Sequence, residues 1–166
     1  MKVVFFSESG IIGKVDRTFP NARNDIAWSI MMDADWCPYG KTPTEKYDLG
    51  VVTIPKTKPN LDVDWFKQHC DKIAIMQEGP HWYFQDYSVE QQFQFVENLR
   101  KADWVWCHNK SDVSYYKGLG CKDVRVMRTL MLPEGLNCQL TTSQKKGILL
   151  GGNFTSWYSG LDSYLI

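Results

Sequence analysis

The sequence predicts an α/β domain with a doubly wound, mainly parallel sheet and helices on both faces. Three observations favour this class: short apolar runs recur along the chain, longer segments of helical or polar character separate them, and the runs are apolar on both faces. Parallel neighbours need crossover connections, which the intervening helices supply. The pattern is therefore Rossmann-like, and a sheet of this kind places its ligands at the carboxyl ends of its strands.

Six apolar runs are predicted to be buried strands. They are residues 3–6, 49–54, 73–76, 104–107, 124–127 and 148–150. Pro55 stops the second run, and glycine-containing turns follow the third and the sixth. We expect these six strands to lie side by side in one sheet.

The segments between the strands predict helices. Expected N-caps are Asn21 or Asn24 for a helix that runs to about Met32, then Asp62, Ser88 and Asn109, while residues 158–166 begin a further helix. Ser88 and Gln91 have the spacing of a capping box. The helix after Ser88 should bury Val89, Phe93, Val96 and Leu99, which recur at helical spacing. The helix after Asn109 should bury Val113 and Tyr116 and end at Gly118 or Gly120.

Two segments do not fit a minimal strand–helix repeat. Residues 33–47 are predicted to be a polar insertion, and residues 130–146 have the composition of a connection between domains. The predicted organisation is a Rossmann-like domain over residues 1–130, a linker over 131–146, and the start of a second domain, or a closing strand and helix, over 147–166.

Composition excludes several classes of function. The chain has 166 residues, with 19 basic and 19 acidic side chains, so it lacks the charge of a general nucleic-acid binder or a polybasic membrane anchor. Its five cysteines form no C-x-x-C pair, which predicts reduced thiols in a cytoplasmic protein and no zinc site. No apolar run is long enough to cross a bilayer. Aromatic residues make up 14% of the chain, and they either fill the core or line a ligand groove.

The loop after the third run is the richest in chemical groups. Glu78 and His81 stand three residues apart and can share proton transfer, while Trp82 and Tyr83 can stack on a sugar ring. The alternative is an aromatic loop that packs on the next helix. His108, after the fourth run, is a candidate ligand-binding residue at the same edge, whereas His69 lies on a predicted helix and is expected to be structural.

Two further loops contain paired glycines. Gly10 and Gly13 follow the first run, where they form either a plain loop or an anion cradle, although neither the dinucleotide nor the phosphate-loop fingerprint is present. Gly151, Gly152 and Asn153 follow the sixth run, as a phosphate-approach turn or a tight turn without a ligand. We expect the strand tips to gather Gly10, Glu78, His81 and His108 along one rim.

Three segments of this pattern resemble glycosyltransferases of the GT-B type. The first is the opening strand with its glycine-bearing loop. The second is residues 102–111, where Ala102-Asp103 precede an apolar strand and Ser111 follows it. The third is residues 145–153, where Gly151-Gly152 follow a strand, and all three resemble the family in layout. The family has two Rossmann-like domains that face a cleft, of which the N-terminal one receives the acceptor and the C-terminal one binds the nucleotide-sugar.

The resemblance implies that Glu78 or His81 is the catalytic base and that Gly10, Gly13, Trp82, Tyr83 and His108 bind the acceptor. It implies that Gly151, Gly152 and Asn153 bind the donor phosphates, with no metal and no cofactor. The expected partners are a nucleotide-sugar donor, held mainly by a second domain, and a sugar or other hydroxyl acceptor. Most of the second domain would lie beyond Ile166, so we expect this fragment alone to be inactive.

Other functions remain open from the sequence. The main alternative is a non-enzymatic, flavodoxin-like ligand-binding or interaction domain. A receiver domain would need an aspartate at the end of the third strand, where Gln77 and Glu78 stand. A flavin carrier lacks its Ser/Thr-rich phosphate loop, and a nicotinamide-dependent oxidoreductase lacks its glycine fingerprint.

Overall fold

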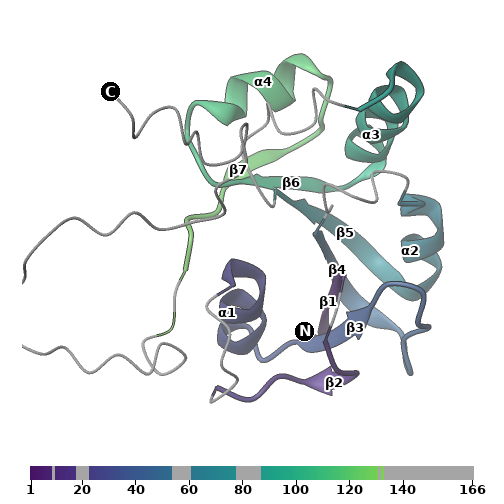
Figure 1. Cartoon of the computed structure of the whole chain (residues 1–166), viewed down its shortest axis with the longest axis vertical. Helices are drawn as coiled ribbons and strands as arrows, with labels where there is room; N and C mark the ends of the chain where they lie inside the picture. Colours follow the sequence, from purple (N-terminus) through teal and green to yellow (C-terminus); the bar gives the residue numbers. More distant parts are fainter. Residues whose placement is uncertain (9, 18–22, 54–60, 78–86, 131, 133–166) are drawn as a thin grey trace, which may run out of the picture.

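The computed structural model describes residues 1–8, 10–17, 23–53, 61–77, 87–130 and 132. Within this part of the chain, seven strands form one sheet in the order β2-β3-β1-β4-β5-β6-β7 (Figure 1). The strands are β1 (Val3–Ser7), β2 (Gly13–Lys14), β3 (Asp35–Pro38), β4 (Tyr47–Thr53), β5 (Cys70–Met76), β6 (Trp104–Cys107) and β7 (Val124–Val126). The helices are α1 (Asn24–Met31), α2 (Val63–His69), α3 (Val89–Lys101) and α4 (Asp112–Gly118).

The sheet is mainly parallel, as predicted. Strands β3, β1, β4, β5, β6 and β7 pair in parallel, and the two-residue strand β2 pairs antiparallel with β3 at the edge. The chain passes from β1 to β3 on one side, then returns past β1 to β4 and continues outward through β5, β6 and β7. The direction of strand addition therefore reverses between β1 and β4.

The core has two parts, one on each face of the sheet. Val4 and Phe6 of β1 belong to a cluster with residues of α2, α3 and α4, such as Phe66, Phe95 and Tyr116. Val3 and Phe5 alternate with them and belong to a second cluster, which contains Ile26 of α1 and residues of the strands. Figure 1 shows the same division, with α1 apart from the other helices. This alternation explains why the strands are apolar on both faces.

Strand β3 corrects the prediction that residues 33–47 are a polar insertion. It lies beside β1, with Phe5 opposite Trp36 in register, and the Trp36 ring stacks on the Phe5 ring at a centroid distance of 6.4 Å. The strand has only four residues. Trp36 and Cys37 are buried, but Asp35 and Pro38 at its ends give the segment the composition of a polar loop. Strand β2 likewise lies inside the predicted glycine-bearing loop.

The start of α1 differs from the predicted cap. Arg23 occupies the N-cap position and Asn24 is the first helical residue, while Asn21 lies outside the described residues. The Asp25 carboxylate accepts a bond from the Ile26 amide at 2.9 Å, so an acidic side chain of the first turn satisfies one free amide of this helix end. Asp62 and Ser88 are N-caps as predicted, and Ser88 and Gln91 form the capping box.

Helix α3 buries only part of the predicted face: Leu99 is buried and Val96 packs against the core, as predicted, but Val89 and Phe93 are exposed. Its buried residues are Phe95, Asn98 and Leu99, whereas Val89 is 71% and Phe93 is 69% exposed. Two apolar stripes lie on this helix, and the one nearer its C-terminus packs on the sheet with Val96 at its border. Periodicity alone did not distinguish the two stripes.

Helix α4 begins two residues later than predicted. Ser111 rather than Asn109 is at the N-cap, and Tyr116 is buried as predicted. The helix ends in a Schellman motif: the Cys121 amide bonds the Tyr116 carbonyl at 3.2 Å, and the Gly120 amide bonds the Lys117 carbonyl at 3.0 Å. Gly120 has a φ of +86°, which is why a glycine follows this helix.

Asp103 extends the pairing of β5 with β6 through its side chain. Its carboxylate accepts bonds from the Ile73 amide and from Lys72 Nζ, each at 3.0 Å. Burial acts to raise the pKa of Asp103, but these two bonds outweigh it and hold the pKa below its usual value. The ionised carboxylate therefore contributes to the stability of the fold.

We expect Asp103→Ala to lower the free energy of unfolding by about 1–2 kcal/mol near pH 7. Because the folded-state pKa is depressed, this contribution is present above the unfolded pKa of about 3.9 and is lost as the pH falls below it. Urea denaturation of both proteins at several pH values measures the difference. A gap between them that stays constant down to pH 2 would contradict the role of the charge.

Among the described residues, no helix combines the length and apolar character that a membrane span requires.

Candidate functional site

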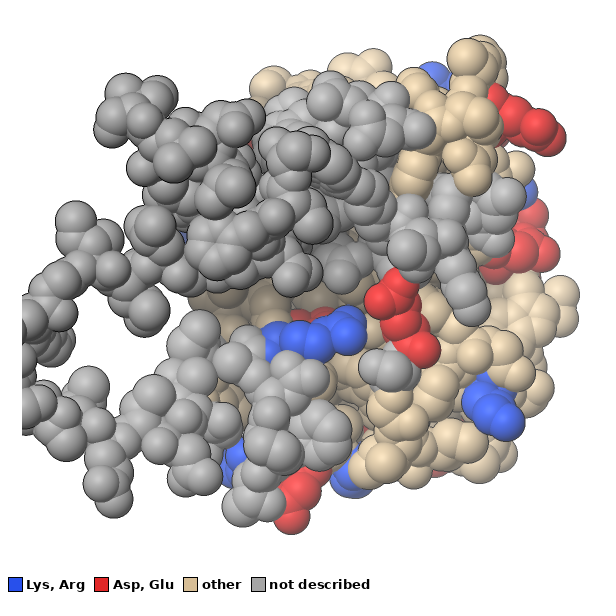
Figure 2. Space-filling view, viewed as in Figure 1, with Lys and Arg blue, Asp and Glu red and all other residues tan. Residues whose placement is uncertain are grey.

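A pocket of about 210 Å³ opens at the carboxyl edge of the sheet, beside the N-terminal end of α1. Its lining residues come from the start of α1 and from the ends of β4, β5 and β6: Arg23, Asn24, Asp25, Thr53, Met76, Gln77 and His108. Figure 2 shows a hollow in the middle of this face, where basic atoms lie beside acidic ones. The pocket lies next to the strands between which the direction of strand addition reverses, where sheets of this kind bind ligands.

The charged part of the pocket is an internally paired group. The Asp25 carboxylate is 4% exposed and accepts bonds from Arg23 Nη2 at 2.6 Å, from Arg23 Nε at 3.0 Å and from Ser7 Oγ at 2.9 Å. Arg23 Nη2 also donates to Ser7 Oγ at 2.9 Å. Ser7 is the last residue of β1, so these hydrogen bonds connect the start of α1 to this central strand. The two opposite charges neutralise each other beside the pocket.

Two buried polar atoms of the lining have no hydrogen-bond partner among the described residues. They are Thr53 Oγ1 and Gln77 Nε2, on side chains that are 3% and 4% exposed. Gln77 Oε1, by contrast, accepts a bond from the backbone amide of His108 at 3.3 Å. This bond identifies which end of the Gln77 side-chain amide is the oxygen and which is the NH₂ group. An unpaired buried donor costs about 1–3 kcal/mol, so these two atoms are groups that a ligand can satisfy.

His108 is held by hydrogen bonds at both ring nitrogens. Its Nδ1 lies 3.1 Å from the carbonyl oxygen of Met127, which can only accept, so Nδ1 carries the proton. Its Nε2 lies 3.5 Å from Asn24 Nδ2. The Leu130 amide donates to Asn24 Oδ1 at 2.7 Å, which leaves the Asn24 NH₂ group facing His108. Both neighbours thus assign the same tautomer, with an unprotonated Nε2 at the pocket.

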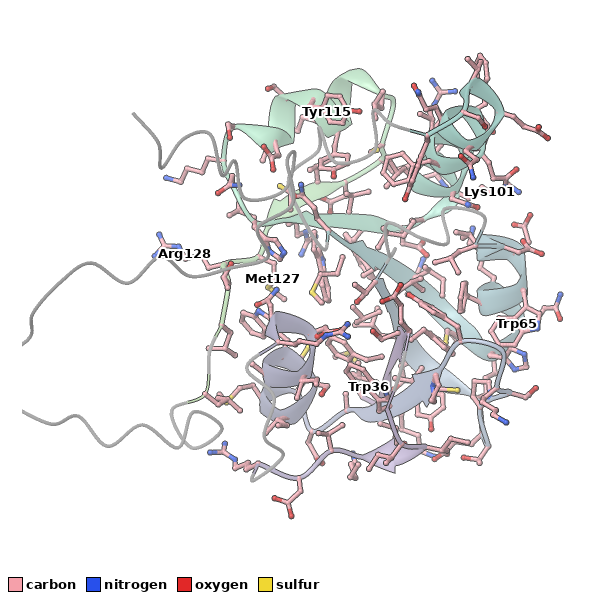
Figure 3. All side chains as sticks on the ribbon, viewed as in Figure 1. Trp36, Trp65, Lys101, Tyr115, Met127 and Arg128 are labelled. Carbon is pink, nitrogen blue, oxygen red and sulfur yellow. The ribbon has the colours of Figure 1, made fainter. Side chains whose placement is uncertain are left out.

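Residues 127–130, which we call the strap, run from β7 past α1 and provide these contacts. The Met127 amide donates to the Cys107 carbonyl at 2.8 Å, and the Trp28 indole donates to the Arg128 carbonyl at 3.0 Å. Figure 3 labels Met127 and Arg128 on this segment beside α1. The strap therefore joins α1 to the end of β6 and orients His108.

The structure places only some of the predicted site residues. His108 lines the pocket, at the rim where it was predicted. Glu78, His81, Trp82 and Tyr83 lie outside the described residues, as do Gly151, Gly152 and Asn153. Gly10 and Gly13 are described but are not among the residues that line the pocket. His69 ends α2, with its ring 4.6 Å from the Trp65 ring.

Gly10 has a structural role that the sequence did not indicate. Its φ is +127°, and a Cβ atom at this position would lie 2.2 Å from Nε1 of Trp36. The backbone must therefore pass close to the indole of β3. Its assignment to acceptor binding stays a prediction.

Of the residues that line the pocket, sequence reasoning named only His108 as a site residue. It missed six: Arg23, Asn24, Asp25, Thr53, Met76 and Gln77. Thr53 and Gln77 were visible as polar residues at the ends of two apolar runs, which is a usable signal in a parallel sheet. Arg23 and Asp25 had no comparable signal, because their importance depends on the contact of α1 with Ser7.

The described residues also bear on metal binding and on thiol chemistry. They include no cluster of three or more His, Cys, Asp or Glu side chains that could hold a metal ion. Cys37, Cys70, Cys107 and Cys121 are free and buried in the described part of the chain. Burial raises the pKa of Cys70 to about 12 and that of Cys121 to about 11, so these thiols are poor nucleophiles at neutral pH.

No protein-family model, curated protein or solved structure matches the chain.

Proposed function

We propose that the chain is the acceptor-side part of a two-domain, GT-B-type glycosyltransferase, and that the pocket beside α1 holds the hydroxyl acceptor. The donor would be a nucleotide-sugar, bound mainly by a second domain. The proposal combines the resemblance in sequence layout with the position of the pocket. The direction of strand addition reverses beside β1, and open α/β sheets with such a reversal bind their ligands at that edge, which supports the proposal.

The observation that carries the proposal is the pair of unpartnered groups, Thr53 Oγ1 and Gln77 Nε2, in the wall of the pocket. A sugar hydroxyl both accepts and donates hydrogen bonds, so one such group can accept from Gln77 and bond the Thr53 hydroxyl in either direction. The volume of about 210 Å³ is several times the roughly 30 Å³ share of a water molecule in the liquid. It therefore has room for part of a small polar molecule.

The charges favour an uncharged acceptor. Asp25 is buried in the lining, and the Arg23 guanidinium is already bonded to it through two nitrogen atoms. An anionic ligand would lie beside a buried carboxylate, which costs free energy in a site of low dielectric. A neutral sugar meets no such penalty.

The remaining roles are also proposals. The sequence offers Glu78 or His81 as candidates for the base, while Trp82 and Tyr83 would shape the acceptor groove and Gly151, Gly152 and Asn153 would approach the donor phosphates. Glu78 directly follows Gln77 in the chain. The rule that ligands bind at the carboxyl ends of parallel strands supports these assignments.

Thr53→Val tests the pocket. The substitution keeps the shape of the side chain and removes an unpartnered hydroxyl, so we expect the unliganded protein to become more stable by about 1 kcal/mol. Binding of methyl glycosides should become about tenfold weaker, because one ligand hydrogen bond is lost. Thermal unfolding and NMR titration of the same samples measure the two effects.

Ser29→Ala is the matched control for this substitution. Ser29 is also a fully buried hydroxyl, but it donates to the Ile26 carbonyl at 2.8 Å on α1. Its removal should lower stability and leave glycoside binding unchanged. A chain that binds no methyl glycoside, or a Thr53→Val protein that binds as the parent does, contradicts the proposed acceptor pocket.

The transferase activity itself is tested on the longest natural reading frame that contains these residues. Incubation with radiolabelled UDP-, GDP- and ADP-sugars and a panel of acceptors should yield a labelled product. Neither transfer nor donor hydrolysis with any of these donors would count against a transferase.

A non-enzymatic, flavodoxin-like binding domain is the second candidate. The six parallel strands, numbered along the chain, have the order 2-1-3-4-5-6, which begins as the flavodoxin-type order does. This candidate would be favoured if the protein encoded by the long reading frame bound a ligand saturably but transferred no sugar.

A further inference from the structure

We propose that His108 Nε2 accepts the proton of the acceptor hydroxyl, with its tautomer set by the strap. This inference rests on the proposed function, because it assigns the catalytic base within the same pocket. It moves the role of base from Glu78 or His81 to a residue whose surroundings the structure describes. The argument has three steps: the protonation pattern of the ring, the access of a ligand to Nε2, and the fate of the proton.

The protonation pattern follows from two neighbours that are themselves fixed. The Met127 carbonyl can only accept, so Nδ1 of His108 donates to it over 3.1 Å. The Leu130 amide can only donate, so its 2.7 Å bond identifies Oδ1 of Asn24 and turns the NH₂ group of Asn24 to His108. An imidazole held by a carbonyl at one nitrogen presents a lone pair at the other, which is the form that a general base requires.

The pocket offers a ligand a route to Nε2, because both His108 and Asn24, the neighbour of Nε2, line it. Its contact with Asn24 Nδ2 is 3.5 Å, at the long end for a hydrogen bond, whereas a bond from a hydroxyl to nitrogen is shorter. A ligand hydroxyl in the pocket can therefore take the place of Asn24 as the donor to Nε2. The same hydroxyl-bearing ligand would contact Thr53 and Gln77, which line the same space.

The proton of the acceptor hydroxyl moves to His108 as the new glycosidic bond forms. As the acceptor oxygen forms its bond to the anomeric carbon of the donor sugar, its proton passes to Nε2. The bond from that carbon to the phosphate oxygen breaks, and the nucleoside diphosphate leaves with the electron pair. The resulting imidazolium keeps its Nδ1–H bond to the Met127 carbonyl.

The charged groups that share the pocket with His108 are Arg23 and Asp25, both from α1, and they are paired with each other. Its neighbours from β4 and β5 (Thr53, Met76 and Gln77) are uncharged. On the strap, Figure 3 shows Arg128 directed away from the sheet. Among the described residues that line the pocket, no net charge therefore opposes the imidazolium.

The first experiment needs no ligand. In the ¹⁵N-labelled chain at pH 7.5, long-range ¹H–¹⁵N spectra of the His108 ring should show a protonated Nδ1 and an unprotonated Nε2. Asn24→Ala should leave this tautomer unchanged, because Met127 still accepts from Nδ1. A ring with its proton on Nε2, or a charged ring at this pH, would overturn the proposal.

The second experiment uses the long reading frame and the labelled-sugar assay. His108→Gln should lower kcat about 100-fold or more with little change in KM, and it should remove the acidic limb of the pH–rate profile. His69→Gln is the matched control, because His69 lies on α2 against Trp65, and it should leave kcat and the profile as they are. An unchanged kcat, or an acidic limb that persists, would overturn the assignment of His108.

The two proposals fail in different ways. If no sugar is transferred by the parent protein, the proposed function fails and the base has no reaction to serve. If sugar is transferred and His108→Gln remains active with a normal profile, the function stands and the inference about His108 is wrong.

Discussion

Asp25→Ala is expected to lower the free energy of unfolding by about 3–5 kcal/mol. The carboxylate is 4% exposed and accepts bonds from two nitrogens of Arg23, from Ser7 Oγ and from the Ile26 amide. Its removal takes away the carboxylate that accepts bonds from the partly buried guanidinium, the Ser7 hydroxyl and the Ile26 amide. Urea denaturation monitored by tryptophan fluorescence and circular dichroism measures the loss.

Two comparisons show whether this effect comes from a buried pair. Asp48→Ala removes an exposed carboxylate that accepts from the Lys2 amide at 2.6 Å and lies 3.9 Å from the terminal amine, and it should cost about 1 kcal/mol or less. The double variant Arg23→Met, Asp25→Leu removes both charges and should be more stable than Asp25→Ala alone. Equal losses for Asp25→Ala and Asp48→Ala would show that Asp25 is not paired in the interior.

Gly10→Ala is the second substitution with a large expected effect, a loss of about 2–4 kcal/mol. An alanine would be strained at a φ of +127°, and its Cβ atom would lie 2.2 Å from Nε1 and 2.7 Å from Cδ1 of Trp36. The Trp36 ring is itself buried against Phe5, so it has little freedom to move away. Thermal and urea unfolding should both report the loss.

Gly13→Ala separates the two causes. Gly13 also has a positive φ, at +102°, but a Cβ atom at this position has no other atom within 4 Å. The variant therefore has the backbone strain without the collision, and its loss should be about half that of Gly10→Ala or less. Similar losses for both variants would exclude the contact with Trp36 as the main cause. Unchanged glycoside binding by either stable variant would indicate that its glycine is not part of the acceptor site.

The sequence predicted the parallel core of the fold well, for a physical reason. Five of its six predicted strands lie in the sheet, because central parallel strands are buried on both faces and leave continuous apolar runs. The sixth, residues 148–150, lies outside the described residues. Strand β3 escaped prediction because only two residues of its four are buried, between Asp35 and Pro38. On α3, Val89 and Phe93 were wrongly expected in the core, because they share the helical spacing of Val96 and Leu99, which do pack there.

The candidate site was predictable only where it lies on the sheet. His108 was identified because the residue after a buried parallel strand lies at the binding edge. Arg23 and Asp25 were not, because they reach the pocket through the packing of α1 on β1, which no local pattern encodes. The roles of Asn24 and of the strap depend on contacts between residues more than a hundred positions apart, such as Leu130 with Asn24.

Those distant contacts have a consequence for how the protein is made. Helix α1 leaves the ribosome early, yet two of its hydrogen bonds, from Trp28 to Arg128 and from Leu130 to Asn24, join residues 100 and 106 positions apart. A nascent chain shorter than about 130 residues can pair its central strands but cannot finish the wall of the pocket. Ligand-binding competence should thus arise late in synthesis, after most of the fold is in place.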